Sequence, residues 1–254
     1  MEQGVSTTLI VAGGVMVAVS ILGLGYGIKQ TIPDVQDSSV GRISRTMDGL
    51  DAVTESNSDV TFDFNDYDNT ASANGLNKAT GVISIPRKVI HKGQIYTVTG
   101  VSKLAQNGEN ITSVSLPNTI ESIESGAFND TNITSITIPD SVTSIGSASF
   151  AGNKQLTQVV IGSGLTSIPA SAFAESPITN LTLGKNVASI GANAFRNNHI
   201  TNLNVPDSVT SIKNGAFVTQ NQAVMQVSIG KNLTVTDPST IFGYTNTAVV
   251  TTRK

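Results

Sequence analysis

One phrase occurs four times in this sequence, and no other feature limits the possible folds as strongly. Residues 141–150 read SVTSIGSASF and residues 208–217 read SVTSIKNGAF. Related copies read GLTSIPASAF at 164–173 and NVASIGANAF at 186–195. The polar letters vary between copies, whereas Ser-Ile and the final Phe are kept. A fixed spacing of kept apolar residues indicates that copies of one small unit stack on each other.

The repeated unit is 22 to 24 residues long, and six copies can be aligned. The copies begin at Ile111, Ile133, Leu156, Ile178, Ile200 and Val224. Apolar residues fill the first, fourth and sixth places, an alternation typical of a short strand with one buried face. Ile returns at the thirteenth place and Phe at the eighteenth, for example at Ile145 and Phe150. We therefore predict a β-rich solenoid of parallel short strands and short helical turns, in which each Ile and Phe packs on its counterpart one coil away.

The unit ITSITIPDSVTSIGSASFAGNKQ at 133–155 resembles the BspA-type leucine-rich repeat, which is about 23 residues long and ends in Ala-Phe. The stretch 81–110 resembles that family's variant first repeat, although Leu104 stands where Phe is expected. Its matching residues are Ile85, Pro86, Gly93, Tyr96, Val98 and Thr99. The resemblance covers about residues 79–247 and implies a parallel-stranded, right-handed solenoid of the kind found mostly in surface proteins that bind host or neighbouring molecules. It implies no catalytic residues.

An uncharged apolar segment, residues 7–28, precedes the repeats. A helix of this length spans about 33 Å, which is enough to cross the hydrocarbon core of a membrane. We predict a hydrophobic α-helix over residues 1–29, in a membrane or in a filament core; a cleaved signal peptide or a buried soluble helix is the alternative. Small residues along it would let two such helices approach closely and self-associate. These residues are Gly14, Ala18, Gly23 and Gly27.

Residues 30–58 are predicted to form an amphipathic helical stalk or linker. Apolar residues spaced 3, 4 and 3 apart form one seam along it. They are Val40, Ile43, Met47 and Leu50. A hydrophobic helix followed by an amphipathic helix and a head domain resembles the layout of type IV pilin subunits, although the first four residues are not basic and Leu9 stands where such subunits carry Glu. A membrane anchor with a helical stalk is the alternative.

Both ends of the solenoid are predicted to be caps. Residues 59–110 form the N-terminal cap and the variant first repeat, and the alternating stretch 60–71 is expected to cover the first coil as a strand. Residues 111–254 hold the six repeats and a C-terminal cap. There, the stretch 248–254 restarts the strand phrase and ends in two charges that suit a terminal edge.

Composition argues against several classes of function. The formal net charge of −3 gives no basic field that would hold nucleic acid, and without cysteine there is no thiolate metal site. The two histidines, His91 and His199, lie on different units, so no catalytic triad is expected and both are predicted to lie at the surface. An acidic run lacks the spacing of a calcium loop and is interpreted as a solvated turn. Its residues are Asp59, Asp63, Asp66 and Asp68. We predict no enzymatic activity, no cofactor and no metal.

Side chains between the buried strand residues are predicted to form parallel ladders across one face of the solenoid. The candidate binding residues are Gln158, Asn180, Thr182, Asn202, Asn204 and Gln226, and the same ladders include Ser113, Ser115, Ser135, Thr137, Val160 and Ser228. The ladders are uncharged and have no aromatic residue, so they lack the anchors of a tight protein interface. Weak contact at many points with a protein or a glycan suits them; a solvated ladder without a ligand is the alternative.

These observations favour a non-enzymatic, membrane-anchored cell-surface leucine-rich-repeat protein that mediates adhesion or interaction with an extracellular protein or glycan. Its expected partners are the membrane or its own hydrophobic helices, which would give a homo-oligomer, and an extracellular ligand. The alternative is a pilin-like subunit of an extracellular filament, with the apolar helix in the core and the solenoid displayed outside.

Overall fold

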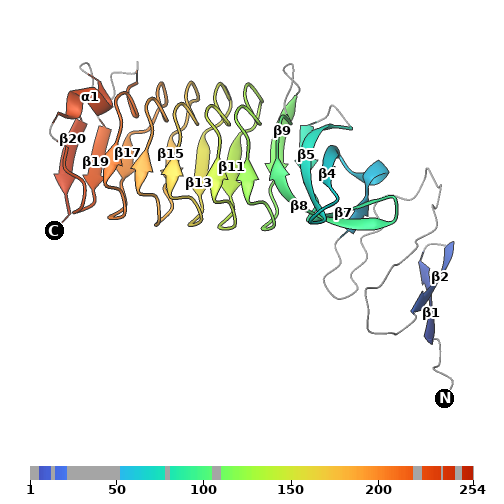
Figure 1. Cartoon of the computed structure of the whole chain (residues 1–254). Helices are drawn as coiled ribbons and strands as arrows, with labels where there is room; N and C mark the ends of the chain where they lie inside the picture. The colour runs from blue at the N-terminus through green and yellow to red at the C-terminus, as the bar shows by residue number, and fades with distance from the viewer. Residues whose placement is uncertain are drawn as a thin grey trace. The chain divides into compact units, whose positions relative to one another are not determined.

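The computed structural model describes residues 6–12, 15–21, 52–77, 81–104, 110–219, 225–235, 237–243 and 248–253. The chain divides into two compact units, Met1–Val35 and Gln36–Lys254. The second unit is a solenoid of stacked coils, with a cap of longer strands at its N-terminal end and the end of the chain at the other (Figure 1). The predicted β-rich repeat architecture is therefore confirmed for this unit.

One strand of each coil lies on what we call the strand face. These strands are β9 (Ile111–Ser115), β11 (Ser135–Ile138), β13 (Gln158–Ile161), β15 (Asn180–Thr182), β17 (Asn202–Asn204) and β19 (Met225–Ile229). Paired neighbours are parallel, and equivalent positions of successive coils lie side by side, so that Ile136 lies beside Val159 and Val159 beside Leu181. At the two ends, β6 (Gly81–Ser84) pairs with β9 and β20 (Ala248–Thr252) pairs with β19. The strand predicted at the C-terminal end is thus confirmed.

A second row of strands, which we call the Ser-Ile face, follows the repeated Ser-Ile dipeptide. Its members are β10 (Ser122–Ile123), β12 (Ser144–Ile145), β14 (Ser167–Ile168), β16 (Ser189–Ile190) and β18 (Ser211–Ile212). Within the pairs, serine lies beside serine and isoleucine beside isoleucine, as in Ile168 beside Ile190. These isoleucines point into the core, where Ile168 and Ile190 are fully buried. The kept dipeptide therefore supplies a column of exposed or half-buried serines and a column of isoleucines that are buried except for the half-buried Ile212.

Phenylalanine at the eighteenth place forms a continuous stack through the interior. The rings of Phe150 and Phe173 lie 5.1 Å apart at 3°, and those of Phe173 and Phe195 lie 5.2 Å apart at 1°. Phe128 begins the stack and Phe242 ends it, and every ring in it is buried. Offset-stacked aromatic rings at this separation attract each other beyond the area that they bury. The prediction that each Phe packs on its counterpart is confirmed.

The segments around these rings are turns rather than the short helices that the sequence predicted. The Phe150 N–H donates to the carbonyl of Ala172 in the next coil at 2.8 Å, and the Phe173 N–H donates to Ala194 in the same way. An α-helix would use those N–H groups within its own segment. Residues with left-handed backbone, such as Ala148 at φ 53° and Gly152 at φ 75°, also interrupt a right-handed helix.

Among the described residues, helix occurs in two short places. The 3-10 helix η1 covers Glu55–Asn57, and α1 covers Pro238–Phe242 in the last coil. At the start of α1, the carboxylate of Asp237 accepts a hydrogen bond from the Ser239 N–H at 2.9 Å, which is the usual N-cap contact. The helix carries Phe242, the last ring of the stack.

The N-terminal cap is built from β3 (Ala52–Thr54), β4 (Val60–Asn65), β5 (Thr70–Leu76), β7 (Lys88–His91) and β8 (Gln94–Val101). They extend the Ser-Ile face in the order β12-β10-β8-β5-β4, with β7 pairing both β3 and β8. The stretch 60–71 does contain a strand, β4, but β4 pairs with β5 and it is β5 that lies directly on β8. The cap therefore covers the first coil with an antiparallel pair.

The hydrophobic α-helix predicted over residues 1–29 is not supported. The described part of this segment forms two antiparallel strands, β1 (Ser6–Ala12) and β2 (Val15–Ile21). The β-branched residues Val, Ile and Thr fill much of both strands, and a Gly-Gly dipeptide, typical of tight hairpins, separates them. These local preferences outweigh the helix that length and apolarity alone suggested.

The predictions that depended on this helix lose their support. Of the four small residues proposed for helix self-association, Ala18 lies in β2 opposite Leu9, and the glycines lie outside the described residues. The apolar seam proposed for the stalk also lies outside them, whereas the end of that segment, residues 52–57, forms β3 and η1 of the cap. No helix within the described residues has the length and apolar character needed to cross a membrane.

Candidate binding face

Two rows of side chains project from the strand face, one from the third and one from the fifth place of each unit. In the first row, Ser135, Gln158 and Asn180 are neighbours in register. Farther along the same row, Asn202 lies beside Gln226. Except for Ser228, which is half-buried, the described side chains of both rows from β9 to β19 are exposed. The rows that the sequence predicted are thus brought together on one face.

Four carboxamides form the C-terminal half of the first row, and we call them the amide row. They are Gln158, Asn180, Asn202 and Gln226. Within the described part of the chain, the carboxamides of Gln158, Asn180 and Gln226 make no hydrogen bond, and that of Asn202 makes one 3.4 Å contact with Thr201 Oγ1. A carboxamide offers two donor hydrogens and an acceptor oxygen, so this row presents unused hydrogen-bonding groups to solvent.

The second row offers fewer free hydrogen-bonding groups than the sequence suggested. Thr182 lies in register with Val160, which is 42% exposed. Asn204, also predicted as a binding residue, is already engaged, because its Oδ1 accepts a 2.7 Å hydrogen bond from Arg253 Nη1. Arg253 additionally pairs with Asp207 at 3.1 Å. The terminal arginine therefore ties the last strand back onto β17 and its following turn.

Threonines at the second place of the units border the amide row and are used by the fold. Thr157 Oγ1 donates to the carbonyl of Thr134, and Thr179 Oγ1 donates to the carbonyl of Thr157, each at 3.3 Å. This column joins coil to coil, so its hydroxyls are less available than the neighbouring carboxamides. No described side chain in either row is charged.

A buried polar column was missed by the sequence analysis. Asn153 is fully buried, and its Nδ2 donates to the carbonyls of Phe128 and Phe150 at 2.9 and 2.8 Å. Its Oδ1 accepts hydrogen bonds from the backbone and hydroxyl of Thr131. Asn198 repeats the pattern two coils later, donating to the carbonyl of Phe173 at 2.8 Å. The signal in the sequence is a Thr, Asn or Ser three places after the Phe, where it resembles an ordinary surface turn.

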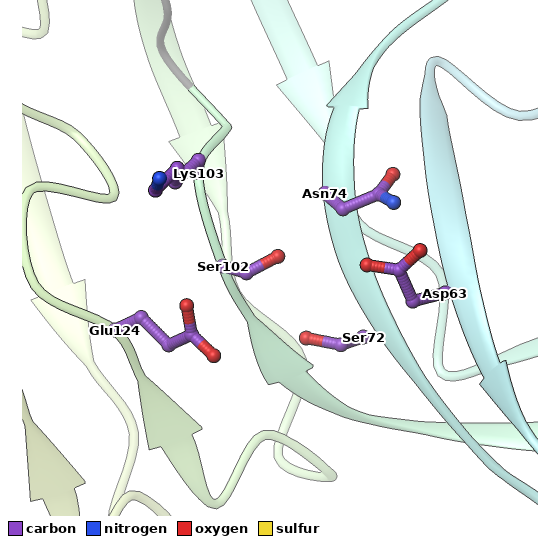
Figure 2. Close-up of a pocket in the computed structure, with 6 residues that line it drawn as sticks. All are labelled: Asp63, Ser72, Asn74, Ser102, Lys103 and Glu124. Carbon is purple, nitrogen blue, oxygen red and sulfur yellow. The ribbon is translucent and has the colours of Figure 1, made fainter.

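An open hollow of about 480 Å³ lies beside the N-terminal cap (Figure 2). Its lining residues are Asp63, Ser72, Asn74, Ser102, Lys103 and Glu124. They come from β4, from β5 and from the residues just after β8 and β10, and they mix both signs of charge. The hollow is polar and open to solvent, whereas small-molecule sites are mostly apolar and enclose most of the ligand.

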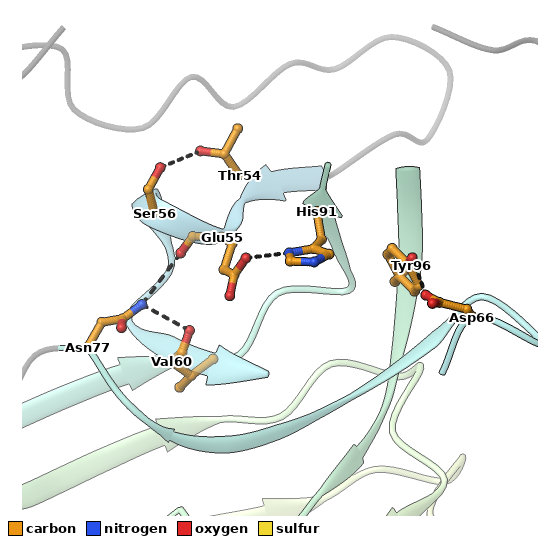
Figure 3. Close-up of polar contacts among 8 residues, drawn as sticks. All are labelled: Thr54, Glu55, Ser56, Val60, Asp66, Asn77, His91 and Tyr96. Atoms are coloured by element: carbon orange, nitrogen blue, oxygen red, sulfur yellow. Dashed lines mark hydrogen bonds and ion pairs between the residues drawn. The ribbon is translucent and has the colours of Figure 1, made fainter. Parts of the chain in front are cut away.

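Histidine and acidic side chains of the cap hold its parts together. The His91 Nδ1 lies 2.6 Å from Glu55 Oε2 (Figure 3). The His91 ring also stacks on Phe64, with centroids 4.1 Å apart. The Tyr96 hydroxyl donates to Asp66 Oδ1 at 2.6 Å, and this hydrogen bond raises the pKa of Tyr96 above its usual value. These contacts link segments about 30 residues apart in the sequence.

The two histidines therefore have different surroundings. The His91 side chain is half-buried, with 25% of its surface exposed, and contacts Glu55, whereas His199 is exposed as predicted. The acidic run is dispersed as well: Asp66 binds Tyr96, and Asp68 accepts from the backbone and hydroxyl of Thr70. Asp66 and Asp68 thus act as hydrogen-bond acceptors within the cap.

Parallel coils of 22 to 24 residues, with one strand per coil on the strand face and a continuous internal Phe stack, define a leucine-rich-repeat solenoid. The BspA type leucine rich repeat region matches residues 100–241 in six copies. The match covers more than half of the chain, and the protein therefore belongs to the BspA-type leucine-rich-repeat family. No curated protein matches the chain.

The chain is also similar to several solved structures. A leucine rich cell surface protein from Faecalibacterium prausnitzii is 26% identical, with a TM-score of 0.51 over 66% of this chain and 52% of that protein. This chain thus spans about half the length of that protein. The leucine rich repeat protein of T. pallidum is 16% identical, with a TM-score of 0.45 over 67% of this chain and 69% of that one. The pneumococcal vaccine antigen PcpA is 14% identical, with a TM-score of 0.46 over 69% and 66%.

Proposed function

We propose that this protein is a non-enzymatic binding module of the cell surface, and that its strand face contacts an extracellular protein or glycan. The observation that carries the proposal is the amide row with its neighbouring second row. Three carboxamides of the amide row make no hydrogen bond within the described fold and are available to a ligand; they are those of Gln158, Asn180 and Gln226. Surface location is supported by the family and by the description of the F. prausnitzii protein as a cell surface protein.

The chemistry of the face favours adhesion through many weak contacts. A tight protein interface is usually anchored by aromatic or arginine side chains that fill pockets, and the described residues of the two rows contain neither. Each hydrogen bond to an exposed carboxamide contributes little, about 0.5–1.5 kcal/mol. Attachment then depends on several coils acting together, and on several copies of the protein on one cell.

The face is tested with charge. The full chain carrying Asn180→Lys and Asn202→Lys places two cations in the amide row, and we expect its attachment to target cells or matrix to fall at least tenfold. The matched control carries Ser144→Lys and Thr166→Lys, which are exposed on or beside the Ser-Ile face. Equal attachment by both variants would show that the strand face is not the binding surface.

Surface display is tested separately. Intact cells that produce the protein are treated with an added protease, and the solenoid is then followed by immunoblot. We expect the solenoid to be accessible to the protease or to an antibody on unbroken cells. If it becomes accessible only after lysis, the protein is not displayed and the proposed function is wrong.

A further inference from the structure

We propose that the ligand of the strand face is an uncharged polysaccharide that lies along the solenoid axis across the amide row. This inference rests on the proposed function, since it names the ligand class of the same face. It is carried by the in-register placement of Gln158 with Asn180 and of Asn202 with Gln226, together with the absence of charge in both described rows.

The spacing of the amide row suits a polymer. Paired strands lie about 4.8 Å apart, so the carboxamides of Gln158 and Asn180, and those of Asn202 and Gln226, repeat at about that interval along the axis. A ligand that places similar groups at similar intervals can bond to several of them at once. A chain of linked sugars does this, because every sugar carries several hydroxyl groups.

The hydrogen-bonding character of the amide row suits sugar hydroxyls. A hydroxyl both donates and accepts, and so does a carboxamide, whereas a carboxylate accepts only and an ammonium donates only. Gln158, Asn180 and Gln226 have both kinds of group unused within the described fold. In the second row, beside the amide row, Thr182 adds an exposed hydroxyl group that can also bond to a sugar.

The charge of the strand face favours a neutral polysaccharide over an anionic polysaccharide or a nucleic acid. An anionic polysaccharide or a nucleic acid gains affinity by pairing with Lys or Arg. Neither occurs in the two rows from β9 to β19, and the whole chain has a formal net charge of −3. The amide row has no cation of its own, and Arg253 beside Asn204 is already paired with Asp207, so an anionic polymer gains little there and a neutral chain is favoured.

The shape of the face predicts a dependence on ligand length. The exposed rows form no enclosed pocket in the described structure, so a single sugar reaches only one or two carboxamides. Each net hydrogen bond strengthens binding by about two- to twelvefold. Affinity is therefore expected to rise with the number of sugars and to level off once the ligand spans about four coils.

The experiment uses the full chain in affinity electrophoresis against neutral polysaccharides (mannan, dextran, laminarin and hydroxyethylcellulose) and against heparin as the anionic probe. We expect retardation by at least one neutral polymer and none by heparin. For the neutral polymer that binds, oligosaccharides of two to eight sugars are titrated calorimetrically. Affinity should increase with length.

Two double variants assign the binding to the amide row. Asn180→Ala with Asn202→Ala should weaken binding of the neutral polymer about fivefold or more, because each change removes one carboxamide. Ser144→Ala with Thr166→Ala, on or beside the Ser-Ile face, should leave it unchanged. Circular dichroism melting of both variants checks that the fold is intact, and Asn180→Gln, which keeps the carboxamide, should retain most of the binding.

Several outcomes would overturn the inference. These are binding of heparin alone, binding of no polymer in the panel, equal binding of a disaccharide and an octasaccharide, and unchanged binding by the Asn180→Ala, Asn202→Ala variant. If attachment to cells is lost in the lysine variant of the amide row while no neutral polymer binds, the face still binds but its ligand is a protein. If attachment is unaffected by that variant, the proposed function itself fails.

Discussion

Individual residues in this solenoid act as members of columns, so the effect of a substitution depends on the coils on either side. The Phe173 ring contacts Phe150 on one side and Phe195 on the other. Asn153 similarly binds two backbone carbonyls, one in its own coil and one in the coil before it. A change at such a position removes contacts from two coils at once.

Phe173→Ala is expected to lower the free energy of unfolding by about 3–5 kcal/mol, because it leaves a cavity between two stacked rings. Urea unfolding followed by circular dichroism measures this change. Tyr67→Ala is the control, since it also truncates an aromatic side chain, but one that is 97% exposed. Equal effects of the two substitutions would show that the Phe stack does not support the fold.

Asn153→Ala is expected to destabilise the protein by about 3 kcal/mol or more, because it leaves the carbonyls of Phe128 and Phe150 and the Thr131 N–H buried without their partner. The control is Asn214→Ala, which changes an exposed asparagine three coils farther along and should alter the free energy of unfolding by less than about 0.5 kcal/mol. Chemical denaturation of both variants compares them directly. A tolerated Asn153→Ala would mean that the buried column is dispensable.

At the level of strands and turns, the sequence predicted those elements in which each position of the repeat is consistently apolar or consistently polar. The strand at 135–138 and the Ser-Ile strand at 144–145 belong to this group, since apolar and polar places recur in every coil. The exposed rows follow from the same alternation, so the candidate site was predictable as a set of positions. The sequence did not predict that Asn180 is free whereas Asn204 is hydrogen-bonded. The partner of Asn204 is Arg253, which lies 49 residues away in the sequence.

Other elements were hidden for identifiable physical reasons. The buried column varies between Thr131, Asn153 and Ser176, all of which resemble surface residues when read singly. The contact of His91 with Glu55 joins residues 36 apart and leaves no local pattern. In the first unit, the length of the apolar segment suggested a helix, while its β-branched residues and Gly-Gly dipeptide favoured strands.

One turn between coils is expected to respond to acid. The Asp140 carboxylate accepts a 2.6 Å hydrogen bond from the Ser163 N–H. This bond, helped by the Ser163 hydroxyl and by the nearby Lys185, lowers the pKa of Asp140 below its ordinary value of 3.8. A lowered folded-state pKa contributes stability that is present above pH 3.8 and is lost as the pH falls through the folded value.

Asp140→Asn should therefore be less stable than the parent protein at pH 7, and the difference should shrink as the pH is lowered below 3.8. Urea midpoints between pH 2.5 and pH 7 measure it. Ser163→Ala keeps the backbone N–H and should retain most of the pH dependence. A constant difference between Asp140→Asn and the parent at every pH would contradict this account.

For the molecule as a whole, stability is shared between neighbouring coils, because each coil contacts only those beside it. Coils are therefore interchangeable in a way that segments of a globular domain are not. Residues 156–177 form one complete unit that contains Phe173. Removing it would bring Phe150 and Phe195 into adjacent coils.

Deletion of residues 156–177 is expected to leave a folded protein with the same circular dichroism shape and a smaller urea m-value, since less surface is exposed on unfolding. Deletion of residues 156–166 removes half a coil and should prevent cooperative folding, because it shifts every column out of register. If both deletions fold, or neither does, the columns do not determine how the coils stack.

The forward hydrogen bonds from each Phe N–H to the next coil also determine how the solenoid bears tension. A pull on its two ends loads the bonds at a terminal coil first, and the interior stays intact until that coil detaches. Each coil then releases about 75 Å of slack chain as its 22 residues straighten. A tether built this way lengthens in steps under shear flow, so a module on a cell surface would dissipate a sudden drag before its bond to a target ruptures.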